Sequence, residues 1–423
     1  MCTKHYLRIA TLAVLATMAT APITVAQEVE VVIEWNRQLQ STLATPGALS
    51  PTIFFTRPYA LLHVAIFDAL NAVDRHYLSY AGELNAPGAR RDVAAAQAAR
   101  DVMVAMFPAQ RAMFDASLAA TLARASSGDA AEGVRVGQAA AMAVLQLREA
   151  DGWSRVPPAS LYPSLPGFWQ PTPPAEAPAA FTHYPEVAGF VVSNGRRFLM
   201  APAPALASES YARDFNEVKA LGAATSGVRT AEQTLVARLW AVVGTTTSQP
   251  AIWNNLIADL ARARALSALE TARLYALLNV AVHDGLLTSF TGKYLYGLWR
   301  PVTAIRNADR DGNASTDSDP GWTSLIATPP YPTYPGNLAC VGAASARILE
   351  RFFGQNDVAF SVTWAAADGP GTTRRYNGFR ELADESARSR IYGGIHFTFD
   401  TLASFGVCTE LADYVFDNSF RRR

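Results

Sequence analysis

The sequence predicts an all-α protein built from helical bundles. Apolar residues recur at helical spacing through most of the chain, no strand-rich block interrupts them, and 50% of the 423 residues are hydrophobic, which is enough to bury a large core. Lys plus Arg (36) equals Asp plus Glu (36), so the formal net charge is zero. A neutral chain has no overall field that attracts nucleic acid or an anionic membrane surface, and we expect neither as a partner.

The first 26 residues resemble a cleaved secretory signal peptide. A positive start (Lys4, His5 and Arg8) precedes an apolar stretch over residues 9–21, and small residues follow before Gln27. The alternative is an uncleaved membrane anchor, which the polar residues from Gln27 onward disfavour, and no later run of about 18 apolar residues occurs. We therefore expect a periplasmic or secreted protein without stable membrane insertion.

The rest of the chain divides into three parts. Residues 27–155 form an N-terminal helical half, residues 156–225 a Pro-rich connector, and residues 226–423 a C-terminal helical domain. Tryptophan and tyrosine in the connector need a surface to pack on, so we expect one compact unit. Apolar periodicity predicts helices over residues 57–75, 91–107, 130–150, 208–221, 230–243, 251–264, 266–290, 339–353, 378–388 and 402–420.

Two cysteines remain once Cys2 leaves with the expected signal peptide. In an exported chain, the pair Cys340 and Cys408 predicts a disulfide. The alternative is two buried thiols that pack as small apolar residues.

Two segments of the C-terminal domain combine cations, glycine and proline in a way that a core does not require. Lys293 and Arg300 are seven residues apart, a step that places both cations on one helical face, and Pro301 is expected to end that helix near Arg300. Gly336 and Asn337 open a predicted helix, whose N-terminal N–H groups and dipole favour an anion. Taken singly, each segment also fits a structural role, as solvated cations or as a capping turn.

A third segment adds a histidine. Arg390 offers bidentate binding of an oxyanion, His396 a nucleophile or metal ligand, and Asp400 a carboxylate that fixes the imidazole tautomer. Gly393 and Gly394 between them leave room for a ligand to approach closely.

In this order, the three segments resemble the superfamily of type 2 phosphatidic acid phosphatases and vanadium-dependent haloperoxidases. The family pattern is a lysine followed seven residues later by Arg-Pro, a Pro-Ser-Gly-His loop, and Ser-Arg with a histidine six residues after the arginine and an aspartate four further on. The first and third motifs match in full, whereas the loop reads Pro335-Gly336-Asn337-Leu338. The N-terminal half, with Trp35-Asn36 and residues 62–72, is similar to the bacterial haloperoxidase-like branch. The resemblance implies helical bundles of the vanadium haloperoxidase and acid phosphatase type.

The resemblance also implies a role for each matching residue. His396 would be the nucleophile or the vanadium ligand, Asp400 would orient it, and Tyr331 would help to line the pocket. Leu338 replaces the acid–base histidine of the family and cannot transfer a proton, and losing a positioned general acid costs about 10²–10⁴ in rate. A phosphate or vanadate ion would be held by Lys293, Arg300, Gly336, Asn337, Arg390 and His396.

Three functions are compatible with these motifs. The leading hypothesis is an exported oxyanion-binding protein that oxidises halide with peroxide when vanadate is its cofactor. The alternatives are an acid phosphatase that acts on phosphomonoesters through a phosphohistidine at His396, and a pseudoenzyme that binds the anion without turnover because of Leu338. The expected partner is a small oxyanion or phosphoester.

The remaining candidates carry weaker signals. His63 lies on an apolar helix and is predicted to be a core histidine, while His283 is a weak candidate for a substitute acid. Asp284 is expected to neutralise an arginine of the site. Residues 307–313 resemble the first half of a calcium loop, but Ser318 stands where the bidentate glutamate belongs, so we expect a solvated loop.

Overall fold

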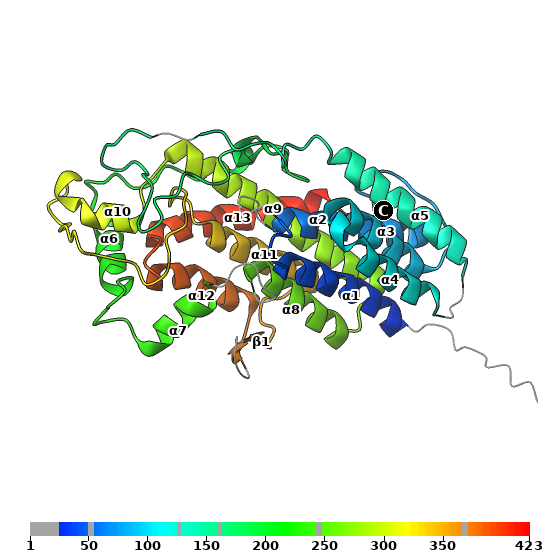
Figure 1. Cartoon of the computed structure of the whole chain (residues 1–423). Helices are drawn as coiled ribbons and strands as arrows, with labels where there is room; N and C mark the ends of the chain where they lie inside the picture. Colours follow the sequence, from blue (N-terminus) through cyan, green and yellow to red (C-terminus); the bar gives the residue numbers. More distant parts are fainter. Residues whose placement is uncertain (1–24, 50–54, 125–127, 160–161, 242–247, 366–370) are drawn as a thin grey trace, which may run out of the picture.

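The computed structural model describes residues 25–49, 55–124, 128–159, 162–241, 248–365 and 371–423. As predicted, this part of the chain is mostly helical, and it adds one short hairpin (Figure 1). Residues 1–24 of the expected signal peptide lie outside the described residues. The elements in chain order are α1 (Val25–Ala44), α2 (Thr56–Asp74), α3 (Arg91–Met106), η1 (Pro108–Gln110), α4 (Arg111–Leu122), α5 (Ala130–Leu147), η2 (Tyr184–Glu186), η3 (Gly195–Phe198), α6 (Glu209–Leu221), α7 (Ala231–Leu239), α8 (Gln249–Ala263), α9 (Ala268–Tyr296), α10 (Pro301–Arg306), η4 (Ala308–Arg310), α11 (Asn337–Phe353), β1 (Phe360–Trp364), β2 (Thr372–Tyr376), α12 (Phe379–Tyr392) and α13 (Thr398–Asn418).

Helices α2 and α9 form the centre of the molecule and pack along each other (Figure 1). Both are buried on nearly all sides, as expected of helices that are surrounded by others. Helices α1, α3 and α5 pack on α2, and helices α8, α11 and α13 pack on α9. The fold is therefore two helical bundles joined through their central helices.

The two bundles repeat each other in sequence and in contacts. Residues 57–70 (RPYALLHVAIFDAL) and 273–286 (RLYALLNVAVHDGL) are identical at nine of fourteen positions. Each stretch carries a buried aspartate, Asp68 or Asp284, whose carboxylate accepts backbone N–H groups of a loop packed against it. Each central helix also bonds an asparagine of the helix before it, His63 to Asn36 and Asn279 to Asn254, both at 3.0 Å.

The repeat extends to the helices that start beside the central pair. The residues before α3 and α11, Arg90 and Gly336, donate their backbone N–H groups to the carbonyls of Asp129 and Asp400, at 3.0 and 2.9 Å. In the N-terminal bundle, the Arg90 guanidinium is buried and pairs with Asp92 at 2.7 Å. The equivalent N-cap position in the C-terminal bundle is Gly336, which has no side chain.

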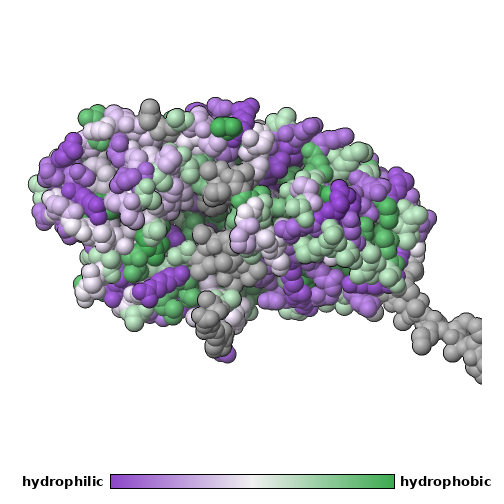
Figure 2. Space-filling view, in the orientation of Figure 1, coloured by the Kyte–Doolittle hydropathy of each residue, from purple (hydrophilic) through white to green (hydrophobic). Residues whose placement is uncertain are grey.

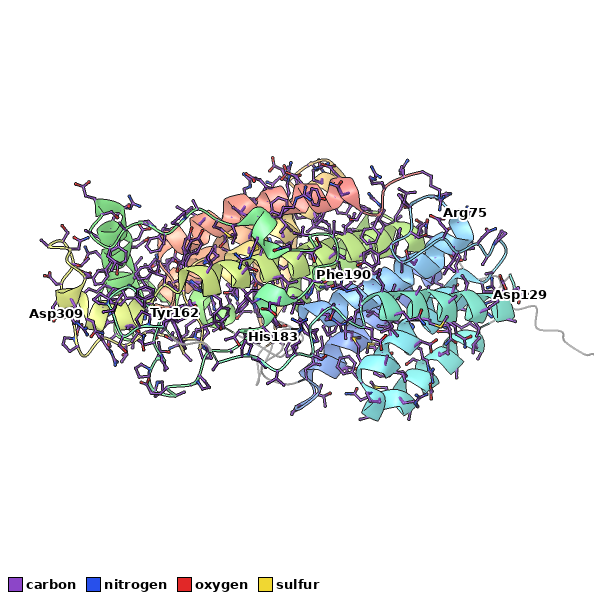
Figure 3. The ribbon with its side chains drawn as sticks, turned by 90° about the horizontal axis from the view of Figure 1, so that it is seen from above. Arg75, Asp129, Tyr162, His183, Phe190 and Asp309 are labelled. Carbon is purple, nitrogen blue, oxygen red and sulfur yellow. A yellow bond between two sulfur atoms is a disulfide. The ribbon has the colours of Figure 1, made fainter. Side chains whose placement is uncertain are left out.

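The connector runs over α9, with Tyr162, His183 and Phe190 marking its path in Figure 3. It bonds the chain that follows α9, because Trp169 N donates to Gly297 O at 2.7 Å and Ala180 N donates to Pro330 O at 2.9 Å. The predicted irregular wrap therefore packs against the segments that carry the sequence motifs.

One prediction about the end of α9 is wrong. Lys293 and Arg300 do not share a helical face, because α9 ends at Tyr296 and Gly297 follows with a φ of 60°, a value that favours glycine. Arg300 is instead the N-cap residue of α10, and Pro301 begins that helix. The two cations meet because the chain turns back, and not because of helical periodicity.

Several elements were not predicted from periodicity. These are α1, the alanine-rich α4, the six-residue α10 and the antiparallel hairpin, in which Phe360 pairs with Tyr376 and Trp364 with Thr372. The six-residue α10 and the five-residue strands carry too few apolar repeats to stand out in a sequence. None of the described helices is long and apolar enough to cross a membrane. On the face shown in Figure 2, hydrophilic and hydrophobic residues are interspersed.

Cys340 and Cys408 form a disulfide that joins α11 to α13 in the core. The bond ties together the two helices whose N-termini carry Asn337 and Asp400. We expect the Cys340→Ala/Cys408→Ala double variant to lose about 2–4 kcal/mol of unfolding free energy, because the bridge closes a loop of 68 residues in the unfolded chain. Urea unfolding followed by circular dichroism measures the loss, and equal stability of the variant and the oxidised protein would contradict the prediction.

Candidate anion-binding site

The three motif segments meet at one buried place in the C-terminal bundle. Arg300 Nη1 lies 3.2 Å from His396 Nε2, and Thr333 of the loop before α11 bonds both His396 and Asp400. Lys293 and Arg300 are fully buried, His396 is 2% exposed and Arg390 is 6% exposed. We call these four residues, Lys293, Arg300, Arg390 and His396, the cation cage.

His396 is held by Asp400. The Nδ1 atom lies 2.9 Å from Asp400 Oδ2, which also accepts the Thr333 hydroxyl at 2.5 Å and the Phe397 N–H at 3.0 Å. A carboxylate in this position places the imidazole proton on Nδ1, so Nε2 presents a lone pair. That lone pair faces the guanidinium of Arg300.

Burial, helped by the neighbouring cations, keeps His396 neutral. Burial lowers its pKa well below the ordinary value, and Arg300, Lys293 and Arg390 lower it further. Burial also raises the pKa of Asp400 to about 6, although the Thr333 hydroxyl and Lys293 oppose the rise. Near neutral pH the pair therefore consists of an imidazole and a carboxylate.

Only some of the hydrogen-bond donors of Arg300 are bonded to other residues of the protein. Its Nε atom donates to Tyr331 O at 2.7 Å, and its Nη1 atom donates to Ile395 O at 2.8 Å. Its Nη2 atom is buried and finds no hydrogen-bond partner among the described residues. An unmet donor on a buried guanidinium is costly, and an anion is the ligand that would satisfy it.

Lys293 donates to three backbone carbonyls of the loop, Pro332 O at 3.0 Å, Thr333 O at 2.7 Å and Pro335 O at 2.5 Å. Only the ammonium form offers three N–H donors. Burial and Arg300 lower the pKa of Lys293, whereas Asp400 raises it, and the three carbonyls also favour the charged form. Lys293 thus fixes the loop in addition to adding positive charge to the cage.

Arg390 completes the cage from the C-terminal turn of α12. Its Nε atom donates to Ser389 Oγ at 3.0 Å, and burial lowers its pKa to about 10, so it stays charged near neutral pH. Tyr331 lies between the cations, with its ring centroid 5.3 Å from Lys293 Nζ and 4.8 Å from the Arg300 guanidinium carbon. An aromatic face at these distances stabilises both positive charges.

The loop before α11 departs from the family motif and yet keeps its place at the cage. Gly336 is the N-cap of α11, and a Cβ at this position would lie 3.2 Å from Asp400 O, a close approach that favours glycine. Helix geometry leaves the N–H groups of Asn337 and Leu338 without acceptors inside the helix. Asn337 is buried and Leu338 is partly buried, with its carbonyl bonded by Gln249.

Thr333 is a site residue that the sequence did not single out. Its hydroxyl donates to Asp400 at 2.5 Å and lies 3.2 Å from His396 Nδ1, so it braces the pair from the loop side. A lone threonine two residues before Pro335 carries no recognisable pattern, and only the folded loop brings it to the histidine.

Three other candidates lie away from the cage. His283 bonds Thr56 at 3.0 Å and packs against Trp153, so it cannot act as the substitute acid. The prediction that Asp284 neutralises a site arginine is wrong, because its carboxylate is engaged by the backbone N–H groups of residues 190–192. His63 is fully buried and stacks on Tyr275, which agrees with a core role.

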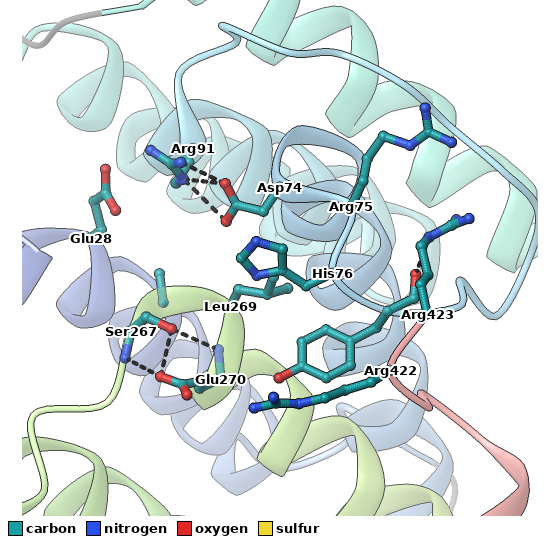
Figure 4. A pocket seen from close by; sticks show the side chains of 12 residues that line it. Glu28, Asp74, Arg75, His76, Arg91, Ser267, Leu269, Glu270, Arg422 and Arg423 are labelled. Atoms are coloured by element: carbon teal, nitrogen blue, oxygen red, sulfur yellow. Dashed lines mark hydrogen bonds and ion pairs between the residues drawn. The ribbon is translucent and has the colours of Figure 1, made fainter.

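A cavity of about 850 Å³ opens elsewhere, between the end of α2 and the start of α9 (Figure 4). Its lining includes Asp74, His76, Arg91, Glu270 and Arg422 and none of the cage residues. Among the described residues, no group of three or more His, Cys, Asp or Glu side chains is placed to hold a metal ion. The donor set of the cage, two guanidiniums, an ammonium and one imidazole lone pair, suits an oxyanion.

Known proteins support this interpretation of the motifs. Residues 273–422 match the family model described as the VCPO second helical-bundle domain, a stretch that holds the whole cage. The vanadium chloroperoxidase of Curvularia inaequalis is 27% identical over 190 residues, which cover 34% of this chain and only 30% of that enzyme.

Two solved structures share the fold. A bacterial vanadium-dependent iodoperoxidase superposes with a TM-score of 0.80 at 22% identity, covering 95% of this chain and 98% of that one. A bacterial vanadium-dependent chloroperoxidase in its holo form gives a TM-score of 0.70 at 16% identity, covering 89% and 93%. The predicted resemblance to the haloperoxidase branch is thus confirmed, as is the predicted fold.

We expect His396 to stay neutral while its tautomer changes near pH 6. Above that value, the Asp400 carboxylate holds the proton on Nδ1; as the pH falls, Asp400 takes up a proton and no longer fixes the tautomer. The ¹⁵N resonances of the His396 ring, assigned with a His396→Gln variant among the six histidines, should move with a midpoint near pH 6. Asp400→Asn should abolish the transition, and conversion to an imidazolium at this pH would contradict the prediction.

Proposed function

We propose that this chain binds vanadate in the cation cage and, with vanadate bound, oxidises halide with peroxide. The observation that carries the proposal is the neutral His396, whose Nε2 lone pair accepts a hydrogen bond from Arg300 Nη1 at 3.2 Å, while the buried Nη2 of that arginine has no partner among the described residues. A coordinating nitrogen beside an unmet cationic donor is the combination that an anionic, coordinating oxyanion requires.

The residues present fit the cofactor. His396 would bind vanadium through Nε2, and Arg300, Arg390 and Lys293 would offset the charge of the oxygens. Bound vanadate supplies a Lewis-acid centre at which peroxide can oxidise a halide. The free N–H groups at the start of α11 add further donors.

The protein contributes orientation, charge and the exclusion of water. Asp400 holds the proton of His396 on Nδ1, so the nitrogen that faces the cage keeps its lone pair. The burial of Arg300 and His396 strengthens every electrostatic interaction in the cage. The same burial favours small reactants such as halide and peroxide over a bulky phosphoester.

The acid phosphatase is the second candidate, since phosphate and vanadate present similar oxygens to the same cations. That reaction would form a phosphohistidine at His396 and would need a proton for the leaving group. Leu338 cannot give one, and Asp400 is engaged by three donors on the far side of His396. The specific feature Leu338 instead favours a non-catalytic anion-binding protein as the main alternative to turnover.

Export is part of the proposal. The leader-like residues 1–26 and the disulfide between Cys340 and Cys408 support a periplasmic or secreted location, where disulfides persist. Halide, peroxide and a small oxyanion are the proposed partners.

We expect orthovanadate to bind saturably, and Arg390→Ala to weaken binding at least tenfold because one of the cage cations is lost. Isothermal titration calorimetry with the mature protein, from which residues 1–26 have been removed, measures both affinities. Arg380→Ala, which removes an exposed arginine from the same helix, is the matched control and should bind as the parent does. No binding by the parent would refute the proposed function.

We expect Leu338→His to raise bromide oxidation in the presence of vanadate and peroxide, by about tenfold or more, because it restores a proton donor at the start of α11. Monochlorodimedone bromination follows the rate, with His396→Ala as the inactive reference. An equal rate in the parent and in Leu338→His would show that another group already supplies the proton.

A further inference from the structure

We propose that Asp214 of α6 is a positioning residue that sets the orientation of His396 by capping the first turn of α13. This inference rests on the proposed anion-binding function of His396. It assigns a role to α6, a helix of the connector that carries none of the sequence motifs.

The first turn of α13 needs outside acceptors. The first four N–H groups of any α-helix lack partners within the helix. The Phe397 N–H, just before α13, is satisfied by Asp400 Oδ2 at 3.0 Å, and the Phe399 N–H is satisfied by Asp214 Oδ2 at 2.8 Å. Asp214 is 1% exposed, so water does not substitute readily for this bond.

Helix α6 contacts residues next to two members of the cage. Tyr211, one turn before Asp214, accepts a hydrogen bond from Trp299 Nε1 at 3.1 Å, and Trp299 directly precedes Arg300. The Tyr211 ring also lies 5.7 Å from the Phe397 ring. Helix α6 therefore contacts Trp299 and Phe397, the chain neighbours of Arg300 and His396.

A second acid on the same face supports the same turn. Glu217 accepts the Thr398 hydroxyl at 2.5 Å and pairs with Arg388 at 2.8 Å. Thr398, Phe399 and Asp400 are the first three residues of α13. Acids of α6 hydrogen-bond the first two, and Asp400 hydrogen-bonds His396. A shift of this turn would move Asp400 Oδ2, and with it the Nδ1 proton of His396.

The test compares Asp214→Ala, Asp214→Asn and Arg213→Ala. The alanine variant removes the acceptor for the Phe399 N–H, whereas the asparagine variant keeps a carbonyl oxygen of the same shape. Arg213→Ala is the matched control, because that arginine is 69% exposed and bonds the other oxygen, Oδ1, of Asp214. Two readouts are used, the dissociation constant for orthovanadate and the ¹⁵N shifts of the His396 ring in the protein without vanadate.

We expect Asp214→Ala to raise the vanadate dissociation constant about tenfold and to mix the two His396 tautomers, as the loss of a buried helix cap would. Asp214→Asn and Arg213→Ala should stay within about threefold of the parent and keep the Nδ1–H tautomer. If Asp214→Ala does not fold, Asp214→Glu decides, because its longer side chain displaces the acceptor from the Phe399 N–H: parental values in the folded variant overturn the proposal, and mixed tautomers with weaker vanadate binding support it.

Parental values of both readouts in a folded Asp214→Ala would also overturn the positioning role. The ring shifts separate this failure from that of the proposed function. If the parent protein binds no vanadate, the function fails, while the tautomer comparison still tests whether Asp214 orients His396.

Discussion

The arrangement of the C-terminal bundle depends on a single buried carboxylate among three buried cations. The negative charge of Asp400 raises the pKa of both Lys293 and Arg300, and its carboxylate holds the proton of His396 on Nδ1. One carboxylate cannot neutralise three cations, so the fold adds backbone carbonyls as acceptors, from residues 331–335 for Lys293 and Arg300 and from Ile395 for Arg300. These bonds fix the conformation of the proline-rich loop, because the carbonyls of Tyr331, Pro332, Thr333 and Pro335 have to point toward the cations. The remaining positive charge is what makes the place suited to an anion.

The fold class and all four cage residues could be predicted from the sequence. Long stretches with apolar residues at helical spacing mark α2, α3, α5 and α9 clearly, and the spacing around Arg390, His396 and Asp400 is specific enough to predict an anion site. What failed was local geometry: the turn at Gly297 separates Lys293 and Arg300, and a motif spacing of seven residues does not reveal it. Thr333 and Asp214 also escaped prediction, because each acts through a contact between distant segments.

The internal repeat shows where the two bundles differ at equivalent helix starts. In both bundles, the residue before the next long helix after the central one donates its backbone N–H to an aspartate carbonyl, Arg90 to Asp129 and Gly336 to Asp400. In the N-terminal bundle, Arg90 forms an ion pair with Asp92 of the same turn, so its charge is neutralised within the protein. In the C-terminal bundle, Gly336 brings no charged side chain to the helix start, and the Nη2 atom of Arg300 has no hydrogen-bond partner among the described residues.

The central pairing of α2 with α9 has a consequence for how the chain folds as it is made. The face of α2 that packs on α9 cannot be covered until residues 268–296 have left the ribosome, some two hundred residues later. Until then, the N-terminal half exposes a large hydrophobic surface, and this state is prone to aggregation or to capture by chaperones. Contacts at such sequence separation also slow folding, since a long loop must close first. The last helix, which brings Cys408 to Cys340, then locks an arrangement that only the complete chain can reach.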